Sequence, residues 1–134
     1  MVIMKRIIID TNFLMIPLKF RVDIFGEFRR ICDFNYKLSV FDGTINELRK
    51  IMETQKGIDK KAAQFGLKLI KLKNIEIIKA KEVKDVDELI AESADKNTIV
   101  ATADAELKKR LLKKNLPVII LRKKQYLKFA KEVF

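Results

Sequence analysis

The chain has 134 residues, of which 49% are hydrophobic and 35% charged, and this composition is typical of one globular domain. It has no histidine and a single cysteine, Cys32, which excludes histidine-based acid–base catalysis, zinc sites of the histidine type and internal disulfides. Its formal net charge is +11, and residues 107–134 carry 10 basic side chains against one acidic side chain. Such an excess of positive charge favours a polyanionic partner such as RNA over a merely solvated helix face.

We expect a cytoplasmic protein without a membrane segment. Lys5, Arg6 and Asp10 interrupt the apolar residues near the N-terminus, unlike the sequence of a signal peptide. Every apolar run is far shorter than the ~18 residues that span a bilayer. The single cysteine, which lies between Ile31 and Asp33, is typical of a packing residue.

Short apolar runs predict buried strands, and apolar residues at helical spacing predict helices between them. The runs at 7–9 and 118–120 are apolar without alternation, as in a parallel sheet covered on both faces. The predicted order is strand 2–9, helix 24–31 with Asp23 as N-cap, strand 37–41, helix 45–52, helix 58–72, strand 75–79, helix 86–94, strand 98–101, helix 107–112, strand 117–121 and a helical tail bearing Tyr126, Leu127, Ala130 and Val133. This order predicts an α/β fold, a three-layer α/β/α sandwich around a central parallel sheet of about five strands, in one domain over residues 1–134.

Acidic residues stand where the predicted strands end. Asp10 follows the first strand, in Asp-Thr-Asn, and Asp104 follows the fourth, in Thr-Ala-Asp. Glu47 lies in the helix after the second strand, and Asp87 opens the helix before the fourth. In a parallel sheet the ligand crevice lies beyond the carboxyl ends of the strands, so these acids would face one another and raise each other's pKa. A divalent cation removes that conflict, and oxygen ligands without histidine or cysteine favour Mg²⁺ or Mn²⁺.

Three of these acids, Asp10, Glu47 and Asp104, have a competing explanation as helix caps. Residues 44–47 have the spacing of a capping box, which would account for Glu47 on its own. Residues 85–88 have the same spacing, and this leaves Asp87 without a capping role and favours it as a ligand. Asp104 is a candidate N-cap for the helix that follows it. Four acids from four separate segments are nevertheless better explained by a shared site.

In their order and context these acids resemble those of the PIN-domain nuclease family. The resemblance spans residues 3–122. The segment 12–28 with Pro17 looks closer to the archaeal relatives of small-subunit rRNA-processing PIN nucleases than to short VapC-type toxins. The matching motifs are the apolar strand ending in Asp10-Thr11-Asn12, Glu47 within Ile-Asn-Glu-Leu, Asp87 with apolar residues three and seven positions later, and Thr102-Ala103-Asp104 followed by Glu-Leu.

The resemblance implies a metal-dependent endoribonuclease that hydrolyses RNA phosphodiester bonds, in rRNA processing or in toxin-like RNA cleavage. Its implied cofactor is Mg²⁺ or Mn²⁺. Its expected partner is RNA and not a membrane, and it allows a homodimer, an antitoxin or a ribosome-assembly partner. The residues expected to carry the chemistry are Asp10, Glu47, Asp87 and Asp104 as metal ligands, Glu47 directly or through water, and Asn12 and Thr102 as residues that orient the carboxylates and position waters.

Two other functions stay open on the sequence. A catalytically silent PIN-like module that binds RNA or a ribosome-assembly partner would share the fold, but the intact acid set favours the enzyme. A phosphotransfer domain also places an aspartate after its first strand. The haloacid dehalogenase type needs a second aspartate where this chain has Asn12, and the receiver type needs one after the third strand, where this chain has Ala80 and Lys81.

Overall fold

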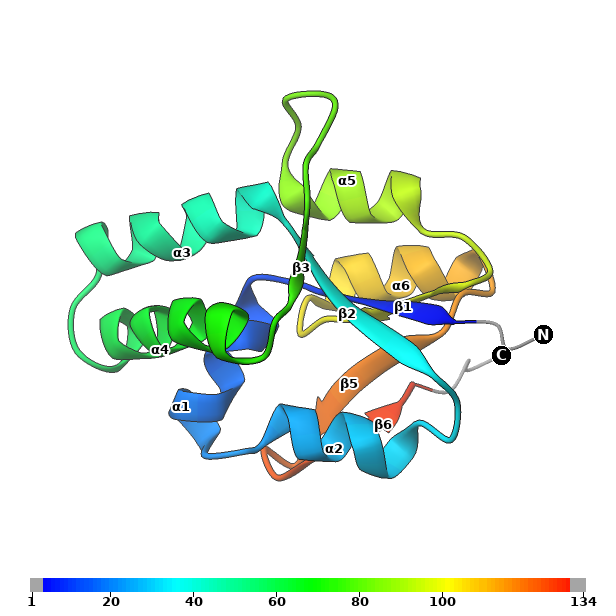
Figure 1. Cartoon of the computed structure of the whole chain (residues 1–134), viewed down its shortest axis with the longest axis horizontal. Helices are drawn as coiled ribbons and strands as arrows, with labels where there is room; N and C mark the ends of the chain where they lie inside the picture. Colours follow the sequence, from blue (N-terminus) through cyan, green and yellow to red (C-terminus); the bar gives the residue numbers. More distant parts are fainter. Residues whose placement is uncertain (1–3, 131–134) are drawn as a thin grey trace.

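The computed structural model describes residues 4–130, which fold around one six-stranded sheet. The strands lie in the order β3-β2-β1-β4-β5-β6 (Figure 1). The first five are parallel, which confirms the predicted sheet, and β6 runs antiparallel to β5. The strands are β1 (Lys5–Ile9), β2 (Tyr36–Phe41), β3 (Glu76–Ile78), β4 (Thr98–Ala101), β5 (Val118–Arg122) and β6 (Tyr126–Phe129).

Helices cover both faces of the sheet, and β1 shows why its residues are apolar without alternation. Ile7 and Ile9 point into one core, which helices α1 to α4 complete, and Ile8 points into a second core under α5 and α6. Cys32 belongs to the first core, and burial raises the pKa of its thiol to about 11, in keeping with a packing role. The helical segments are the 3₁₀ turn η1 (Asn12–Met15), α1 (Ile16–Phe20), α2 (Ile24–Ile31), α3 (Asp42–Thr54), α4 (Ile58–Leu72), α5 (Val86–Ser93) and α6 (Ala105–Lys113).

The strand order places the ends of β1 and β4 side by side. After β1 the chain builds β2 and β3 on one side, then crosses to the other side of β1 to form β4. Ile9 at the end of β1 is in register with Ala101 at the end of β4. The amide of Asp10 continues this pairing and donates to the Ala101 carbonyl at 3.0 Å. In such sheets the point where the strand order reverses is where ligands bind. Within residues 4–130, no helix is both long and apolar enough to traverse a bilayer.

The prediction of a helical tail is wrong. Tyr126 and Leu127 lie in β6, whose hydrogen bonds with β5 outweigh the helical spacing of the apolar residues. Val133 lies outside the described residues. The hairpin turns through Lys123 and Lys124, with φ of 54° and 55°, as in the two-residue turns that asparagine and glycine normally form. The sequence therefore carries no ordinary hairpin motif at this position.

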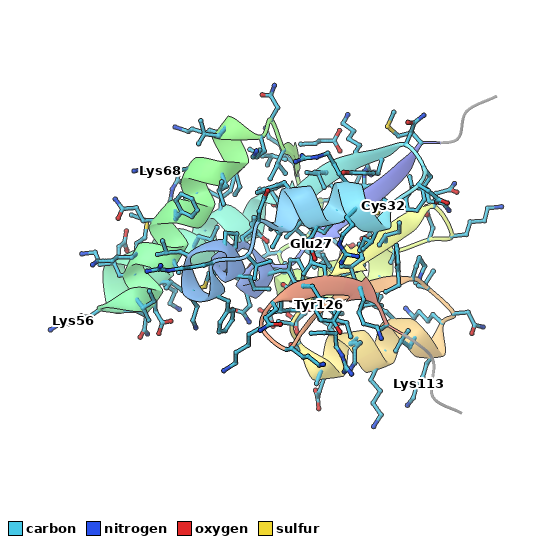
Figure 2. All side chains as sticks on the ribbon, turned by 90° about the horizontal axis from the view of Figure 1, so that it is seen from below. Glu27, Cys32, Lys56, Lys68, Lys113 and Tyr126 are labelled. Carbon is cyan, nitrogen blue, oxygen red and sulfur yellow. The ribbon has the colours of Figure 1, made fainter. Side chains whose placement is uncertain are left out.

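Helix α2 covers the outer edge of β6. Glu27 accepts a hydrogen bond from the Leu127 amide at 2.9 Å, and Arg30 donates to the Leu127 carbonyl at 2.8 Å. Figure 2 shows Glu27 between α2 and β6. The two side chains also pair with each other, and the Arg30 hydrogen bond lowers the pKa of Glu27. The predicted N-cap of this helix is confirmed, because Asp23 accepts from the Gly26 amide.

Candidate active site

Asp10 is the buried centre of the acidic group. It is 7% exposed, and both of its carboxylate oxygens are occupied: Oδ1 accepts the Thr11 amide and Oδ2 accepts the Thr102 hydroxyl, each at 2.8 Å. Burial raises the pKa of Asp10, the two hydrogen bonds oppose that rise, and the charges of Asp104 and Asp87 add to it. Among the described residues, no cation pairs with this carboxylate.

Thr102 and Asp104 form the β4 side of the site. The Thr102 side chain is buried, and its oxygen accepts the Asp104 amide at 3.0 Å while its hydroxyl proton goes to Asp10. Oδ1 of Asp104 caps α6 by accepting the amides of Glu106 at 2.8 Å and Leu107 at 3.1 Å. Its Oδ2 accepts no hydrogen bond from residues 4–130. Capping thus uses one oxygen of Asp104 and leaves the other available for a ligand.

The capping box predicted at residues 44–47 is wrong, because α3 begins earlier, at Asp42. Thr44 is the third residue of the helix and is fully buried, and its hydroxyl oxygen accepts a hydrogen bond from Thr11 at 3.2 Å. Asp42 bonds instead to the amides of Gly43 and Ala80. Glu47 is therefore free of the capping role that the sequence suggested.

Glu47 lies exposed on α3 and faces the other acids. Loss of surrounding water is the main cause that raises the pKa of its carboxyl, and a hydrogen bond from the Thr11 hydroxyl lowers it. Further increases come from the charges of Asp10, Asp87 and Asp85. Both pKa values are therefore raised mainly by loss of surrounding water and further by like charge, although Asp10 is buried and Glu47 keeps an exposed surface.

The capping box predicted at residues 85–88 is wrong as well. Helix α5 begins at Val86 without a hydrogen bond from the Asp85 side chain. Glu88 accepts from Arg110 of α6 at 2.7 Å instead, and this contact lowers the pKa of Glu88. Asp87 is exposed, and its carboxylate accepts no hydrogen bond from the described residues. Of the acids in this segment, Asp87 is the one whose charge reaches both Asp10 and Glu47.

A close approach of α3 to α5 brings their acids near each other. A Cβ added to Gly43, at the start of α3, would lie 2.9 Å from Cγ2 of the buried Val86 at the start of α5. Real side chains essentially never approach so closely. Glycine at this position is therefore what allows the starts of the two helices to sit so close, with Asp87 in the first turn of α5 and Glu47 in the second turn of α3.

The four acids share one end of the sheet without forming a closed cage. Asp104 and Asp87 act on Asp10, and Asp10 and Asp87 act on Glu47. Within residues 4–130, however, no three of these carboxylates stand close enough to hold a metal ion together. Asn12 contributes no contact to them; it is exposed on η1 and lines a neighbouring pocket.

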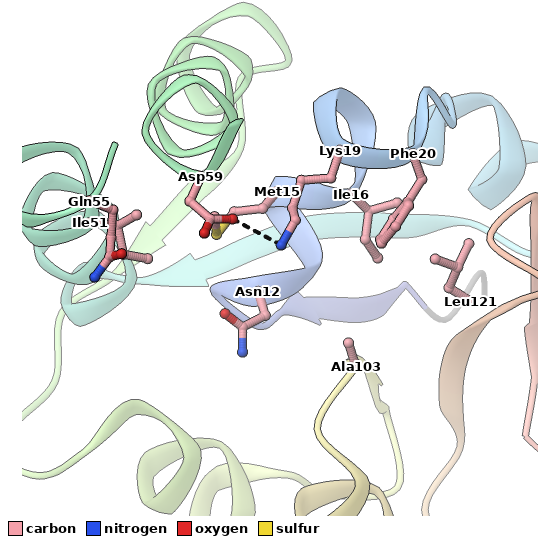
Figure 3. Close-up of a pocket in the computed structure, with 10 residues that line it drawn as sticks. All are labelled: Asn12, Met15, Ile16, Lys19, Phe20, Ile51, Gln55, Asp59, Ala103 and Leu121. Atoms are coloured by element: carbon pink, nitrogen blue, oxygen red, sulfur yellow. Dashed lines mark ion pairs between the residues drawn. The ribbon is translucent and has the colours of Figure 1, made fainter. Parts of the chain in front are cut away.

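Two pockets border the acids. One, of about 380 Å³, extends from Asn12 and Ala103 to the ion pair between Lys19 and Asp59 (Figure 3). The other, of about 320 Å³, shares Ala103 with the first and includes Asp104. Asp104 therefore stands in a hollowed part of the surface, where a large ligand could reach it.

Comparisons with known proteins identify the family of the chain. A family model described as a PIN like domain matches residues 7–124. The chain belongs to the PIN domain family. It is 30% identical over 125 residues to Ribonuclease VapC4 of Methanocaldococcus jannaschii, covering 92% of this chain and 95% of the relative. It is 31% identical over 129 residues to Ribonuclease VapC9 of Archaeoglobus fulgidus, covering 95% of this chain and 86% of the relative.

Among solved structures, the PIN domain has a fold similar to that of the PIN domain endonuclease Utp24. The TM-score is 0.78 and the identity 22%, with 96% of this chain and 92% of that chain covered. The two sequence relatives are thus named VapC, and this structural relative is Utp24. The comparisons support the family and leave the predicted closeness to the rRNA-processing branch as a prediction.

The sequence does not predict the roles of two hydroxyl groups of this PIN domain, those of Thr11 and Thr44. Thr11 and Thr44 join the end of β1 to α3, and the Thr11 hydroxyl also reaches Glu47. Their signal in the sequence is spacing, because Thr44 precedes Glu47 by one helical turn and therefore shares its face of α3. The same spacing is also that of a capping box.

Proposed function

We propose that this PIN domain is an endoribonuclease that hydrolyses RNA phosphodiester bonds with the aid of Mg²⁺ or Mn²⁺. One observation carries the proposal: four carboxylates without a cation partner gather at the point where the strand order reverses, in a chain of net charge +11. Acids kept close together without partners destabilise the fold, and the raised pKa values of Asp10 and Glu47 are typical of a functional site. The ribonuclease names of the two relatives support the same reaction.

The oxygen ligands of the site suit a hydrated hard cation better than a fully caged one. Mg²⁺ usually keeps several waters and binds through one or two carboxylates. Asp10 and Asp104 are neighbours across Thr102, and Oδ2 of Asp104 is free among the described residues. We infer that these two bind the ion and that Glu47 and Asp87 act on its waters. When bound, the ion would neutralise the phosphate and lower the pKa of a coordinated water.

The chain's own residues would orient these groups. Thr102 bonds Asp10 and Asp104 at once, so one hydroxyl group sets the relative position of two carboxylates. Thr11 donates to Thr44 on the same helix as Glu47 and lowers the pKa of Glu47, so it lies beside that carboxylate.

RNA would reach the site along α6, whose lysines differ in what they contact. Lys108 lines the pocket that holds Asp104, and Lys109 and Lys113 are exposed on the helix. Lys114 already donates to the Ala91 carbonyl at 2.8 Å, so its main contact is within the fold. We propose that Lys108, Lys109 and Lys113 hold flanking phosphates, which adds affinity without sequence specificity. The homodimer, antitoxin and ribosome-assembly partners stay predictions.

Incubation of the purified chain with total RNA and Mn²⁺ tests the proposal. We expect cleavage by the wild type, and at least a ~100-fold loss in Asp10→Asn, Asp87→Asn and Asp104→Asn. Glu88→Gln is a control matched to Asp87→Asn, because Glu88 lies on the same turn of α5 but pairs with Arg110. If Asp10→Asn cleaves as fast as the wild type, the proposal is wrong. RNA binding without cleavage by the wild type would favour the silent module.

A further inference from the structure

The pocket beside Asp104 combines an aromatic ring with cations. Phe20 of α1 lines it together with Asp104, and Leu121 of β5 adds apolar surface. Its volume of about 320 Å³ falls within the range of small-ligand pockets, about 300–1,000 Å³. Three cationic side chains line the same space: Lys108, Arg122 and Lys124. Figure 3 shows Phe20 and Leu121 facing each other at the margin that this pocket shares with its neighbour.

The ring of Phe20 is available for stacking from the side of the pocket. Nζ of Lys124 lies 5.5 Å from the ring centroid, a distance typical of a cation–π contact. Phe20 is half-buried and packs against the first core, so α1 holds the ring in place, whereas Lys124 is an exposed side chain. A flat aromatic group can therefore take the place of the ammonium on this ring without moving the fold.

The backbone that carries Lys124 departs from the usual hairpin sequence. Both Lys123 and Lys124 have positive φ, where asparagine or glycine would fold with less strain. Residues held at positive φ cluster at functional sites. Here this conformation places an ammonium group over Phe20 and at the edge of the pocket that contains Asp104.

We propose that Phe20 and Lys124 form a nucleobase subsite for single-stranded RNA next to the cleavage site. In it the base stacks on Phe20, and Lys124 moves off the ring to bind a phosphate together with Arg122. Cations combined with an aromatic platform are how proteins hold single strands, whose unstacked bases are free to turn outward. Because Asp104 lines the same pocket, the bound nucleotide is adjacent to the scissile phosphate. This inference rests on the proposed function, since it assumes that RNA is the substrate.

Tryptophan fluorescence tests the stacking directly, because the chain contains no tryptophan. Phe20→Trp is made in the Asp10→Asn protein, which binds without cleaving, and is titrated with a short oligoadenylate. We expect saturable quenching, and none with an oligomer of the same length made of abasic nucleotides. Phe34→Trp is the matched control, because Phe34 precedes β2 at the opposite end of the strands and should show no quenching. Equal quenching by the abasic oligomer, or none by oligoadenylate, overturns the proposal.

Two further variants separate binding from folding. Phe20→Leu keeps an apolar side chain but removes the ring, and we expect about five- to hundredfold weaker oligoadenylate binding. Lys124→Gly removes the ammonium and relieves the positive φ, so binding should weaken while the melting temperature stays equal or rises. A purely structural Lys124 would instead give a lower melting temperature and unchanged binding, and that result would count against the subsite.

The outcomes also distinguish this inference from the proposed function. Cleavage by the wild type without stacking on residue 20 would leave the nuclease proposal standing and remove the subsite. Stacking on residue 20 without cleavage by the wild type would refute the nuclease proposal and leave the subsite as part of an RNA-binding surface.

Discussion

The two ends of the sheet treat the same kind of residue in opposite ways. At the amino ends of the strands, the carboxylate of Glu76 forms ion pairs with Nζ of Lys37 at 2.7 Å and with Nη2 of Arg6 at 3.0 Å. The hydrogen bond from Lys37 is the main cause that lowers the pKa of Glu76. At the carboxyl ends, burial and like charge raise the pKa values of Asp10 and Glu47, and among the described residues neither has an ion pair.

This difference shows which charges serve the fold and which serve a ligand. A carboxylate beside two cations costs the folded state little and contributes to its stability. The acids at the other end could have been paired too, because the chain has 29 lysine and arginine residues. Their lack of cation partners is the local inconsistency that is expected at functional sites.

A divalent cation should affect the two ends of the sheet differently. Millimolar Mn²⁺ should raise the melting temperature of the wild type, because an ion that binds only the folded state stabilises it, by about 2.7 kcal/mol at a hundred times its Kd. Asp10→Asn and Asp104→Asn should lose most of this shift. Glu76→Gln, at the paired end, should keep all of it. Thermal melts with EDTA and with Mn²⁺ provide the measurement, and a wild type that never shifts would refute the metal site.

Gly43 offers a way to separate the acids physically. Gly43→Ala should destabilise the protein by about 1–3 kcal/mol, because the new methyl group overlaps buried Val86, and should slow RNA cleavage as α3 and α5 move apart. Adding Val86→Ala removes the overlap, so the double variant should be more stable than the sum of the single changes predicts. Urea unfolding of the four proteins measures this coupling. Strict additivity would show that the contact does not set the spacing.

Stability as a function of pH should differ in sign between the two ends. The pKa of Glu76 is lowered from 4.5, so its contribution is present above that pH and lost as the pH falls through the lowered value. Glu76→Gln should therefore cost at most about 1 kcal/mol at pH 7 and nothing in acid. The pKa of Asp10 is raised from 3.8, so its charge opposes folding at pH 7. Asp10→Asn should be no less stable than the wild type at pH 7, with any advantage disappearing in acid.

Urea unfolding between pH 3 and pH 7 measures both effects. Parallel curves for Asp10→Asn and Glu76→Gln would mean that the two ends do not differ.

Much of the fold was predictable because most elements agree with their local sequence. The apolar run at residues 98–101 coincides with β4, and the helical spacing at residues 58–72 coincides with α4. The elements that the sequence did not predict are those whose structure depends on tertiary contacts or that are too short for a pattern. Strand β6 exists because the edge of β5 offers hydrogen bonds, and the turn that precedes it is built from two lysines. The short α1 has Pro17 in its first turn and too few residues for a periodic pattern.

The candidate site was predictable as a set of segments but not as a set of contacts. Asp10 and Asp104 follow from the rule that ligands bind beyond strand ends, and the structure places them across Thr102. The role of Thr44 did not follow, because its spacing to Glu47 matches a capping box and only the true start of α3 shows otherwise. Spacing also could not reveal that the missing side chain of Gly43 leaves room for Val86, because that contact joins segments far apart in the chain.

The hydrogen bonds that Glu27 and Arg30 make with the backbone of Leu127 affect how β6 can pair with a strand of another copy of this protein. An edge strand normally offers its outward amides and carbonyls to any other chain, which invites growth into fibres. On β6, the Leu127 amide donates to Glu27 and the Leu127 carbonyl accepts from Arg30, both of α2. The opposite edge, β3, has only three residues and begins with the ion-paired Glu76. Among the described residues, α2 therefore occupies part of the β6 edge and the β3 edge is short, so neither edge offers a long row of unpaired amides and carbonyls to a second copy.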